Sequence, residues 1–315
     1  MSGPLQRARL NIPLVPSLRQ PHPEAPQAEP VALRSHRSRD RFLCSSARFE
    51  RELLAQGWLA PGPLEAVLAG GAPRGGRGPT SRVLLPQSRV ALHLRPLRHG
   101  GWLGRLWLDL DFGLARPLRE LRVTAELRAR GAPVPEPALV AARRVLGPLW
   151  QSALGSVEQA GSESALARLR AQPALRERID LARQAGHSIA RFHAAGGRHP
   201  DLHLGNLLVS GAAAAPRVLV VDLDRARLAA PGSARRRARE LARLYRSALK
   251  QRVAPGLDRR TLAAFLGAYC GRDRALRAAL RRELPRARAG VALHRIGYGL
   301  GRLAGRRAAA DRGTS

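Results

Sequence analysis

The hydrophobic positions of this chain change their spacing near its middle. In the first half, apolar residues form short runs bounded by prolines, which predicts strands. In the second half they recur at steps of three and four, which predicts amphipathic helices. The predicted strands of the first half are Arg82–Leu85, Arg89–Leu94, Leu139–Leu146 and Leu149–Leu154. The clearest helical series is Leu175, Ile179, Ala182, Ala185, Ile189 and Phe192, and it stops at Gly196 and Gly197.

Smaller features complete this pattern. Pro117 starts a helix in the first half, and Gly131 is placed to end it, because proline suits a first turn and glycine a C-terminus. The other expected features, in chain order, are short helices between Phe42 and Leu68, an extended connector at 133–137, a hinge or loop at 155–164, two strands at Leu207–Val209 and Val218–Val221, and helices from Ala238 to about residue 308.

The order of these elements predicts an α+β protein in two parts. Residues 41–155 form a sheet with one main helix, and residues 156–308 form a mostly helical part. Residues 1–40 contain seven prolines and no apolar period, so we expect a disordered tail there. Residues 309–315 are expected to be a disordered end.

The charge of the chain is strongly positive. Lys and Arg number 55 against 23 Asp and Glu, the formal net charge is +32, and Lys250 is the single lysine. Such a chain attracts anions in a salt-dependent way. The arginines are spread over the whole chain, however, and aromatic residues that could stack on bases make up only 4%. We therefore expect no specific nucleic-acid partner.

Other sequence features bear on the compartment. Cys44 and Cys270 are too few for a disulfide framework, which is typical of a reducing cytosol. No apolar run approaches the roughly 18 residues of a membrane span, and no signal peptide is evident at the N-terminus. We expect a cytoplasmic protein.

The candidate chemistry lies between the long helix and the two short strands of the second half. The sequence there reads His199-Pro200-Asp201-Leu202-His203-Leu204-Gly205-Asn206, and Asp222-Leu223-Asp224 follows the second strand. H-x-D-L-x-x-x-N is the pattern of a kinase catalytic loop. Phosphoryl transfer needs a carboxylate that accepts the acceptor hydroxyl's proton, and oxygen ligands that hold Mg²⁺ against the phosphates of ATP.

These needs assign the residues of the loop. We expect Asp201 to be the catalytic base, Asn206 and Asp222 to be Mg²⁺ ligands, and His199 to brace the loop. Any one of these residues taken alone is better explained as a loop cap or a strand end. The combination, at this spacing and between a helix and a hairpin, favours the kinase interpretation.

Two further patterns are set aside. Asp111-Phe112-Gly113 matches the kinase metal-binding string, but it precedes the catalytic loop, whereas the metal-binding aspartate must follow it. His199 and His203 have the spacing of a zinc pair on a helix, but Pro200 obstructs a helix and no third ligand is near in sequence.

A phosphate-anchoring cation with an acidic partner should precede the loop. The only lysine, Lys250, comes too late, so Arg95 at the end of a predicted strand is the best substitute, and Glu120 on the Pro117 helix is its expected partner. Arginine is a rigid fork, so the geometry must differ from that of a Lys–Glu pair. Gly76 and Gly78 belong to a turn whose backbone N–H groups could approach phosphates, a weak signal when taken alone.

At this point the sequence resembles a known family, the lipopolysaccharide kinases that phosphorylate 3-deoxy-D-manno-octulosonic acid (Kdo), within the protein-kinase-like superfamily. The resemblance runs from about Gly75 to Lys250. Its more discriminating part is Asp222-Leu223-Asp224-Arg225 followed by Leu241 to Ser247. The other segments that carry it are Gly76–Thr80, Leu94–Gly101, Arg116–Glu120, Gly131–Pro135 and the catalytic loop.

The resemblance implies a two-lobed fold, with a small antiparallel-sheet N-lobe and a mostly helical C-lobe. It also implies ATP and Mg²⁺, the Kdo 4-hydroxyl of the lipid A inner core (or another anionic sugar) as acceptor, and peripheral contact with the cytoplasmic face of the inner membrane. Arg225, Arg243 and Arg246 become possible substrate contacts. The chain departs from the family at His203, where Asn is more common, and at Gly205, where His is common.

Two alternatives stay open. His199 to Asn206 is also close to the loop of aminoglycoside and choline phosphotransferases, which act on small molecules. The high positive charge is equally typical of a catalytically inactive anion-binding protein. Turnover on a soluble alcohol would favour the first alternative, and anion binding indifferent to Asp201→Ala would favour the second.

Overall fold

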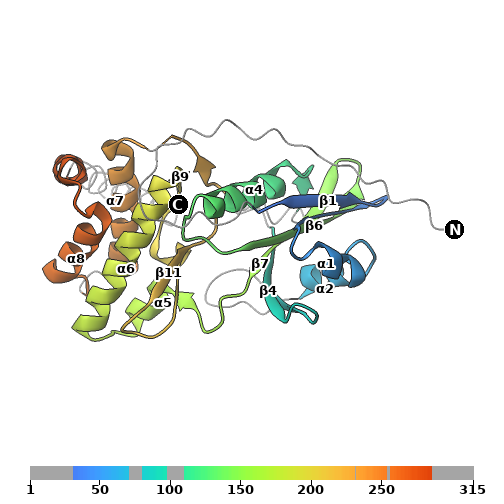
Figure 1. Cartoon of the computed structure of the whole chain (residues 1–315), viewed down its shortest axis with the longest axis horizontal. Coiled ribbons are helices and arrows are strands. Elements are labelled where there is room, and N and C mark those ends of the chain that lie inside the picture. Colours follow the sequence, from blue (N-terminus) through green and yellow to red (C-terminus); the bar gives the residue numbers. More distant parts are fainter. Residues whose placement is uncertain (1–30, 71–79, 98–109, 231, 254–255, 286–315) are drawn as a thin grey trace, which may run out of the picture.

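A computed structural model describes residues 31–70, 80–97, 110–230, 232–253 and 256–285. It has two lobes, and Figure 1 shows the sheet-containing N-lobe and the helical C-lobe side by side, with helix α4 between them on one face. The two-lobed α+β fold predicted from the sequence is confirmed.

The N-lobe is built around a seven-stranded antiparallel sheet. Six strands follow the order β1-β2-β6-β7-β4-β3. The seventh, β5, is outside this order and pairs with β7. The elements of this lobe are β1 (Leu33–Arg37), β2 (Arg41–Ser46), α1 (Glu50–Ala55), α2 (Pro63–Ala69), β3 (Ser81–Leu85), β4 (Val90–Pro96), β5 (Asp111–Phe112), α4 (Ala115–Ala129), β6 (Pro137–Leu146) and β7 (Leu149–Val157).

Both faces of this sheet are covered, and β2 shows how the sequence achieves this. Leu43 points to the core formed with α1 and α2, while Phe42 and Cys44 point to the core formed with Leu121 of α4. All six residues of β2 are buried. A strand covered on both faces has no polar alternation, which removes the usual sequence signal of a strand.

The C-lobe is mostly helical, with small strand pairs around the candidate catalytic loop. β10 pairs with β11 and β8, and β9 pairs with β12. Residues 274–285 are also helical. The other elements are β8 (Glu163–Ser164), α5 (Ala165–Arg170), α6 (Leu175–Ala194), β9 (Gly197–Arg198), the 3₁₀ turn η1 (Leu204–Asn206), β10 (Leu207–Ser210), β11 (Arg217–Val220), β12 (Arg227–Leu228), α7 (Ala234–Lys250) and α8 (Arg259–Cys270).

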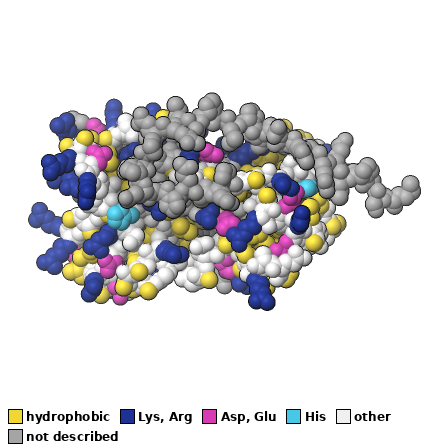
Figure 2. Space-filling model, in the orientation of Figure 1, with side chains coloured by type: hydrophobic (Ala, Val, Ile, Leu, Met, Phe, Trp, Pro, Cys, Tyr) yellow, Lys and Arg dark blue, Asp and Glu magenta, His cyan; other side chains and the backbone are white. Residues whose placement is uncertain are grey.

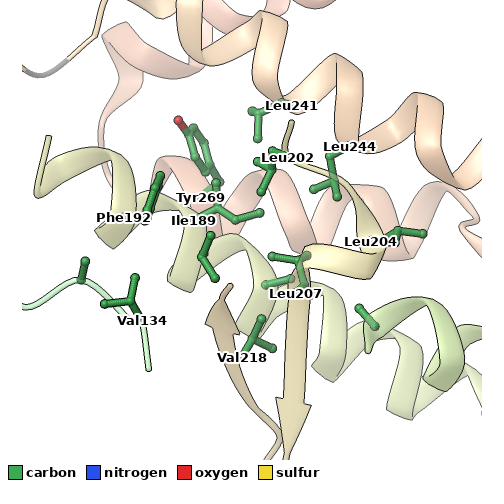
Figure 3. Close-up of a cluster of buried hydrophobic side chains, with 14 of the residues drawn as sticks. Val134, Ile189, Phe192, Leu202, Leu204, Leu207, Val218, Leu241, Leu244 and Tyr269 are labelled. Atoms are coloured by element: carbon green, nitrogen blue, oxygen red, sulfur yellow. The ribbon is translucent and has the colours of Figure 1, made fainter. Parts of the chain in front are cut away.

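Helix α6 is the spine of this lobe. Ile189 and Phe192 on its buried face are fully inaccessible and pack with Tyr269 of α8 (Figure 3). Gly186 allows α6 and α8 to approach closely, because a Cβ atom at this position would lie 2.4 Å from the carbonyl oxygen of Phe265. The helix predicted from the apolar spacing that begins at Leu175 is confirmed, and it packs in the core of the C-lobe.

Most predicted elements match, and the differences concern β1, β2 and β7 of the N-lobe and the unpredicted helix α5 of the C-lobe. The strand β1 falls within the predicted tail 1–40, so the prediction is wrong for these residues: pairing with β2 orders them despite the nearby prolines. The strand β2 occupies part of a segment predicted to be helical. The strand β7 runs on to Val157, so the predicted hinge begins later than residue 155. The rest of the predicted N-terminal tail, the predicted C-terminal end and the last predicted helices lie outside the described residues.

Within the described ranges, no helix combines the length and apolarity needed to cross a lipid bilayer.

Candidate active site

Buried leucines hold the candidate catalytic loop in place. Leu202 is fully buried and Leu204 nearly so, while the side chain of Asp201, directly before Leu202, is 58% exposed. Leu202 and Leu204 belong to the same buried cluster as Leu241 and Leu244 of α7 (Figure 3). The alternation of apolar and polar residues in the loop thus buries one side of it and presents the Asp201 carboxylate to solvent, where an acceptor hydroxyl can reach it.

Hydrogen bonds connect the loop to the segment that follows β11. The Asn206 amide nitrogen donates to the carbonyl oxygen of Asp201 at 3.1 Å. Val221 N–H donates to the Asn206 carbonyl oxygen at 2.9 Å. The His199 Nε2 lies 3.1 Å from the Val221 carbonyl oxygen. These bonds bring Asp201, Asn206 and Asp222 to one place although Asp222 is distant in sequence.

The buried His199 side chain contacts the segment that follows β11. Its ring is buried, and burial lowers the pKa of the imidazole, against the opposing effects of the Val221 carbonyl and nearby carboxylates. Its Nε2 is therefore the N–H donor to Val221 when the ring is neutral. The bracing role of His199 stays a prediction, and this is the contact on which it would depend.

Helix α7 supports the loop at two points that the sequence did not single out. Glu240 Oε2 accepts from His199 N–H at 3.1 Å and lies 3.1 Å from His193 Nε2. About two turns further along the helix, Ser247 Oγ accepts from Leu204 N–H at 3.0 Å. His193 Nδ1 lies 2.7 Å from the Tyr269 hydroxyl, so α6, α7 and α8 share one polar network behind the loop.

The cation predicted for the N-lobe is present with its predicted partner. Arg95 is on β4 and Glu120 on α4, and the Arg95 Nη2 to Glu120 Oε1 distance is 2.5 Å. The same Nη2 atom lies 3.5 Å from Asp222 Oδ1. Arg95 therefore links the N-lobe sheet, α4 and the C-lobe segment that ends at Asp222.

Burial governs the electrostatics of this pair. Burial raises the pKa of Glu120, whose side chain is 2% exposed, and Arg95 opposes this rise. For Arg95, burial acts to lower the pKa, but the carboxylates of Glu120 and Asp222 outweigh it, so the pKa is raised. Arg95 is thus the group that favours the charged form of Glu120, against the effect of burial.

A second ion-pair network joins the lobes beside the first. Arg116, in the first turn of α4, donates two hydrogen bonds to Asp224, with Nε to Oδ1 at 2.9 Å and Nη2 to Oδ2 at 3.0 Å. Arg116 Nη1 also lies 3.3 Å from Asp111 Oδ1. Burial alone would raise the pKa of Asp224, but Arg116 lowers it. No pairing of Asp111 or Arg116 with Asp224 is predicted from the sequence, because no local spacing connects these residues.

His203 and Gly205, the two positions that depart from the family pattern, lie next to each other in the structure. A Cβ atom at Gly205 would lie 3.0 Å from two atoms of the His203 ring. His203 Nε2 is 3.9 Å from Asp201 Oδ2. Glycine at 205 therefore leaves the room that the histidine at 203 occupies beside Asp201.

The remaining predicted residues are placed as follows. Arg225, Arg243 and Arg246 are exposed, the last two on the outer side of α7. Figure 2 shows Lys and Arg side chains gathered over the end of the molecule where Figure 1 places α7 and α8. Gly76 and Gly78 lie outside the described residues.

The oxygen donors at this site suit magnesium. Asp222 supplies a half-exposed carboxylate and Asn206 an amide whose nitrogen is already bound to Asp201. Mg²⁺ takes hard oxygen ligands, uses one or two protein side chains, and completes its shell with phosphate oxygens and water. Asp222 and Asn206 therefore fit the ion as a pair, with the rest of the shell left to the nucleotide.

A strand cation paired with a helix glutamate, a loop carrying Asp201 and Asn206, and an aspartate after the following hairpin define a protein-kinase-like enzyme. The model of the lipopolysaccharide kinase (Kdo/WaaP) family matches residues 74–269. The chain belongs to this family, which confirms the resemblance noted in the sequence and the enzyme class, a kinase.

Curated relatives support the same assignment. The 3-deoxy-D-manno-octulosonic acid kinase of Xanthomonas oryzae pv. oryzae (strain PXO99A) is 35% identical over 184 residues, covering 57% of this chain and 69% of that protein. The protein of the same name from Xylella fastidiosa (strain M12) is 34% identical over 169 residues, covering 52% of this chain and 64% of that protein.

Solved structures are also similar at lower identity. WaaP in complex with acyl carrier protein is 23% identical, with a TM-score of 0.49, covering 78% of this chain and 98% of that chain. Glucosamine kinase in complex with glucosamine, ADP and inorganic phosphate is 13% identical, with a TM-score of 0.37, covering 87% of this chain and 89% of that chain.

Proposed function

We propose that this protein transfers the γ-phosphoryl group of ATP to the 4-hydroxyl of Kdo in the lipid A inner core. The observation that carries the proposal is the convergence of Asp201, Asn206 and Asp222 with the Arg95–Glu120 pair. Family membership supports the reaction class and the lipopolysaccharide acceptor. The choice of hydroxyl comes from the family resemblance.

Each residue has a distinct task in this reaction. Arg95, held by Glu120, orients the α- and β-phosphates. Asp222 and Asn206 hold Mg²⁺, which when bound neutralises charge on the phosphates. Asp201 aligns the acceptor hydroxyl and accepts its proton as the phosphoryl group passes in line. Because Asp201 is exposed and its loop is anchored from behind, the base is both reachable and fixed.

The acceptor is anionic, and the surface near the C-lobe helices is basic. We assign Arg225, Arg243 and Arg246 as candidate contacts to the acceptor's carboxylates and phosphates, since guanidinium groups bind such anions bidentately. A lipid-linked acceptor also places the enzyme in peripheral contact with the cytoplasmic face of the inner membrane. If so, turnover on a lipid-borne acceptor decreases with salt more steeply than turnover on soluble Kdo.

The test is ADP release from Mg²⁺-ATP in the presence of Kdo-bearing lipid A. Soluble Kdo and simple sugar alcohols serve as parallel acceptors, and Asp201→Ala serves as the inactive control. We expect turnover on the Kdo-lipid that disappears in the variant, and phosphate on the 4-hydroxyl by NMR of the product.

Other outcomes would point elsewhere. Turnover confined to soluble alcohols would indicate a small-molecule phosphotransferase. Nucleotide binding without turnover on any acceptor would contradict an active Kdo kinase. Salt-sensitive anion binding unchanged by Asp201→Ala, again without turnover, would indicate an anion-binding protein.

A further inference from the structure

We propose that Arg116 is a positioning residue that fixes the metal-binding Asp222 by clamping Asp224 to the N-lobe. This inference rests on the proposed function, in which Asp222 holds Mg²⁺. The clamp has three parts, which are Asp111 on β5, Arg116 on α4 and Asp224 after β11. It gives a role to the Asp111-Phe112-Gly113 string, which stands on the wrong side of the catalytic loop to bind the metal.

The contacts make a rigid bridge between the lobes. Arg116 meets both carboxylate oxygens of Asp224 through its fork, at 2.9 and 3.0 Å. Arg119, one turn along α4, donates from Nη2 to the Asp224 carbonyl oxygen at 2.8 Å. A bidentate pair fixes orientation as well as distance, and the added bond to the backbone fixes the chain itself.

Asp111 anchors the N-lobe end of the bridge. It is 3% exposed, and its Oδ2 accepts from the Ser152 hydroxyl at 2.9 Å while Oδ1 faces Arg116. The strand pairing of β5 with β7 places this carboxylate, because Asp111 is opposite Trp150. The guanidinium of Arg116 therefore lies between two acidic side chains, one fixed in the sheet and one in the C-lobe.

The segment that the bridge holds has an unusual backbone. Asp222 has a φ angle of +63°, in the left-handed region that side chains other than glycine rarely adopt. The segment is fixed before this residue by the bond from Val221 N–H to Asn206, and after it by the clamp on Asp224. Losing the second support would let Asp222 relax toward a commoner conformation and turn its carboxylate away from the metal position.

A different role for Asp224 makes the opposite prediction. If Asp224 bound the metal directly, Arg116 would compete with the metal, and removing Arg116 would leave Mg²⁺ affinity unchanged or raise it. If Arg116 positions Asp222, its removal lowers that affinity. Residues that orient metal ligands typically affect metal affinity by about 10- to 100-fold.

The experiment measures ADP binding by calorimetry, with Mg²⁺ and with EDTA, on the full chain. The variants are Arg116→Gln, Arg116→Lys, Asp224→Asn and the double variant Arg116→Gln/Asp224→Asn. Arg122→Gln, an exposed arginine on the same helix, is the matched control. We expect the single variants at 116 and 224 to lose about tenfold or more of the Mg²⁺-dependent gain in affinity, with binding in EDTA unchanged.

Three further readouts test the bridge itself. The double variant should lose no more than the larger single loss, because both changes remove the same contact. Arg116→Lys should recover part of the loss, since it restores the charge without the fork. Asp111→Asn, which weakens only one end of the bridge, should show a smaller loss of the same sign.

The failures are distinguishable. Mg²⁺-dependent affinity that is unchanged or increased in Arg116→Gln would overturn the clamp and leave the proposed function standing. So would equal losses with Mg²⁺ and with EDTA, because these would make the contact a general brace. If the wild-type protein binds ADP with the same affinity in Mg²⁺ and in EDTA, both the clamp and the proposed function are overturned.

Discussion

The side chain of Asp201 is exposed while its neighbour Leu202 is fully buried. The same division occurs at the Arg95–Glu120 pair, in which the arginine is 27% exposed and the glutamate 2%. At both positions a buried group fixes the geometry and a more exposed group is left to meet the substrate. Single-residue changes should therefore affect activity and stability separately.

Changing Asp201 should affect turnover and leave folding intact. Asp201→Asn keeps the size of the side chain and removes the proton acceptor, so we expect turnover to fall by at least about 10²- to 10⁴-fold. The melting temperature should stay within about 1 °C, because exposed positions contribute little to stability. Steady-state kinetics and thermal unfolding check this, with the exposed Asp40→Asn as control. Retention of full turnover would rule out Asp201 as the base.

Removing Arg95 should make stability depend on pH. In Arg95→Gln, burial and the nearby Asp222 and Asp224 carboxylates raise the folded-state pKa of Glu120 above the ordinary value of 4.5, and Arg95 no longer opposes them. A carboxyl with a raised folded-state pKa favours folding below its unfolded pKa and loses this contribution as pH rises. We expect a loss of about 3 kcal/mol relative to wild type at pH 8 and a smaller loss at pH 5.

Urea unfolding at the two pH values measures this difference. The double variant Arg95→Gln/Glu120→Gln is the control, because it has no carboxyl to titrate and should lose the pH dependence. Equal losses at pH 5 and pH 8 in the single variant would contradict the argument.

At the scale of elements, α7 does more than its amphipathic pattern indicates. Its apolar face, including Leu241 and Leu244, enters the C-lobe core. Glu240 and Ser247 on the same helix bind backbone N–H groups of the catalytic loop. The helix therefore fixes both ends of the loop, and its sequence combines a packing role with a positioning role.

Ser247→Ala tests this support. It leaves the Leu204 N–H without its acceptor, which costs about 1–3 kcal/mol for a buried donor. Because small displacements of catalytic groups are costly, turnover should fall by roughly tenfold or more. Ser233→Ala is the matched control, since Ser233 precedes the same helix and its side chain makes no capping bond. Kinetics equal to wild type in Ser247→Ala would show that the loop needs no support from α7.

At the scale of the whole molecule, the residues proposed to bind the nucleotide are divided between the lobes. Arg95 and Glu120 belong to the N-lobe, and Asn206 and Asp222 to the C-lobe. A ligand that spans both lobes stabilises the native state by mass action, by about 2.7 kcal/mol at a hundredfold excess over its Kd. Nucleotide binding should therefore be visible in the unfolding of the whole chain.

We expect Mg²⁺-ADP to raise the melting temperature by roughly 5 °C. The rise should shrink when EDTA replaces Mg²⁺, and Asp222→Asn should remove the metal-dependent part. Differential scanning calorimetry measures both. A metal-dependent rise that survives Asp222→Asn would argue against this residue as the principal ligand.

The sequence alone predicted the helices α6, α7 and α8, four strands of the N-lobe, and the residues of the candidate catalytic loop. These features have local signals, because helical period, proline boundaries and the spacing of Asp201 and Asn206 are all written within a few residues. The Arg95–Glu120 pair could also be predicted from the sequence, because a kinase needs a cation and an acidic partner before its catalytic loop.

The other features depend on contacts formed in the folded protein. The strand β2 is buried on both faces and gave no alternation, and β1 is ordered by pairing with β2. Asp111, Arg116 and Asp224 meet only when the sheet, α4 and the segment after β11 come together. Glu240 and Ser247 reach the loop only because α7 packs against it. Contacts of this kind join residues far apart in the chain, so no local pattern in the sequence encodes them.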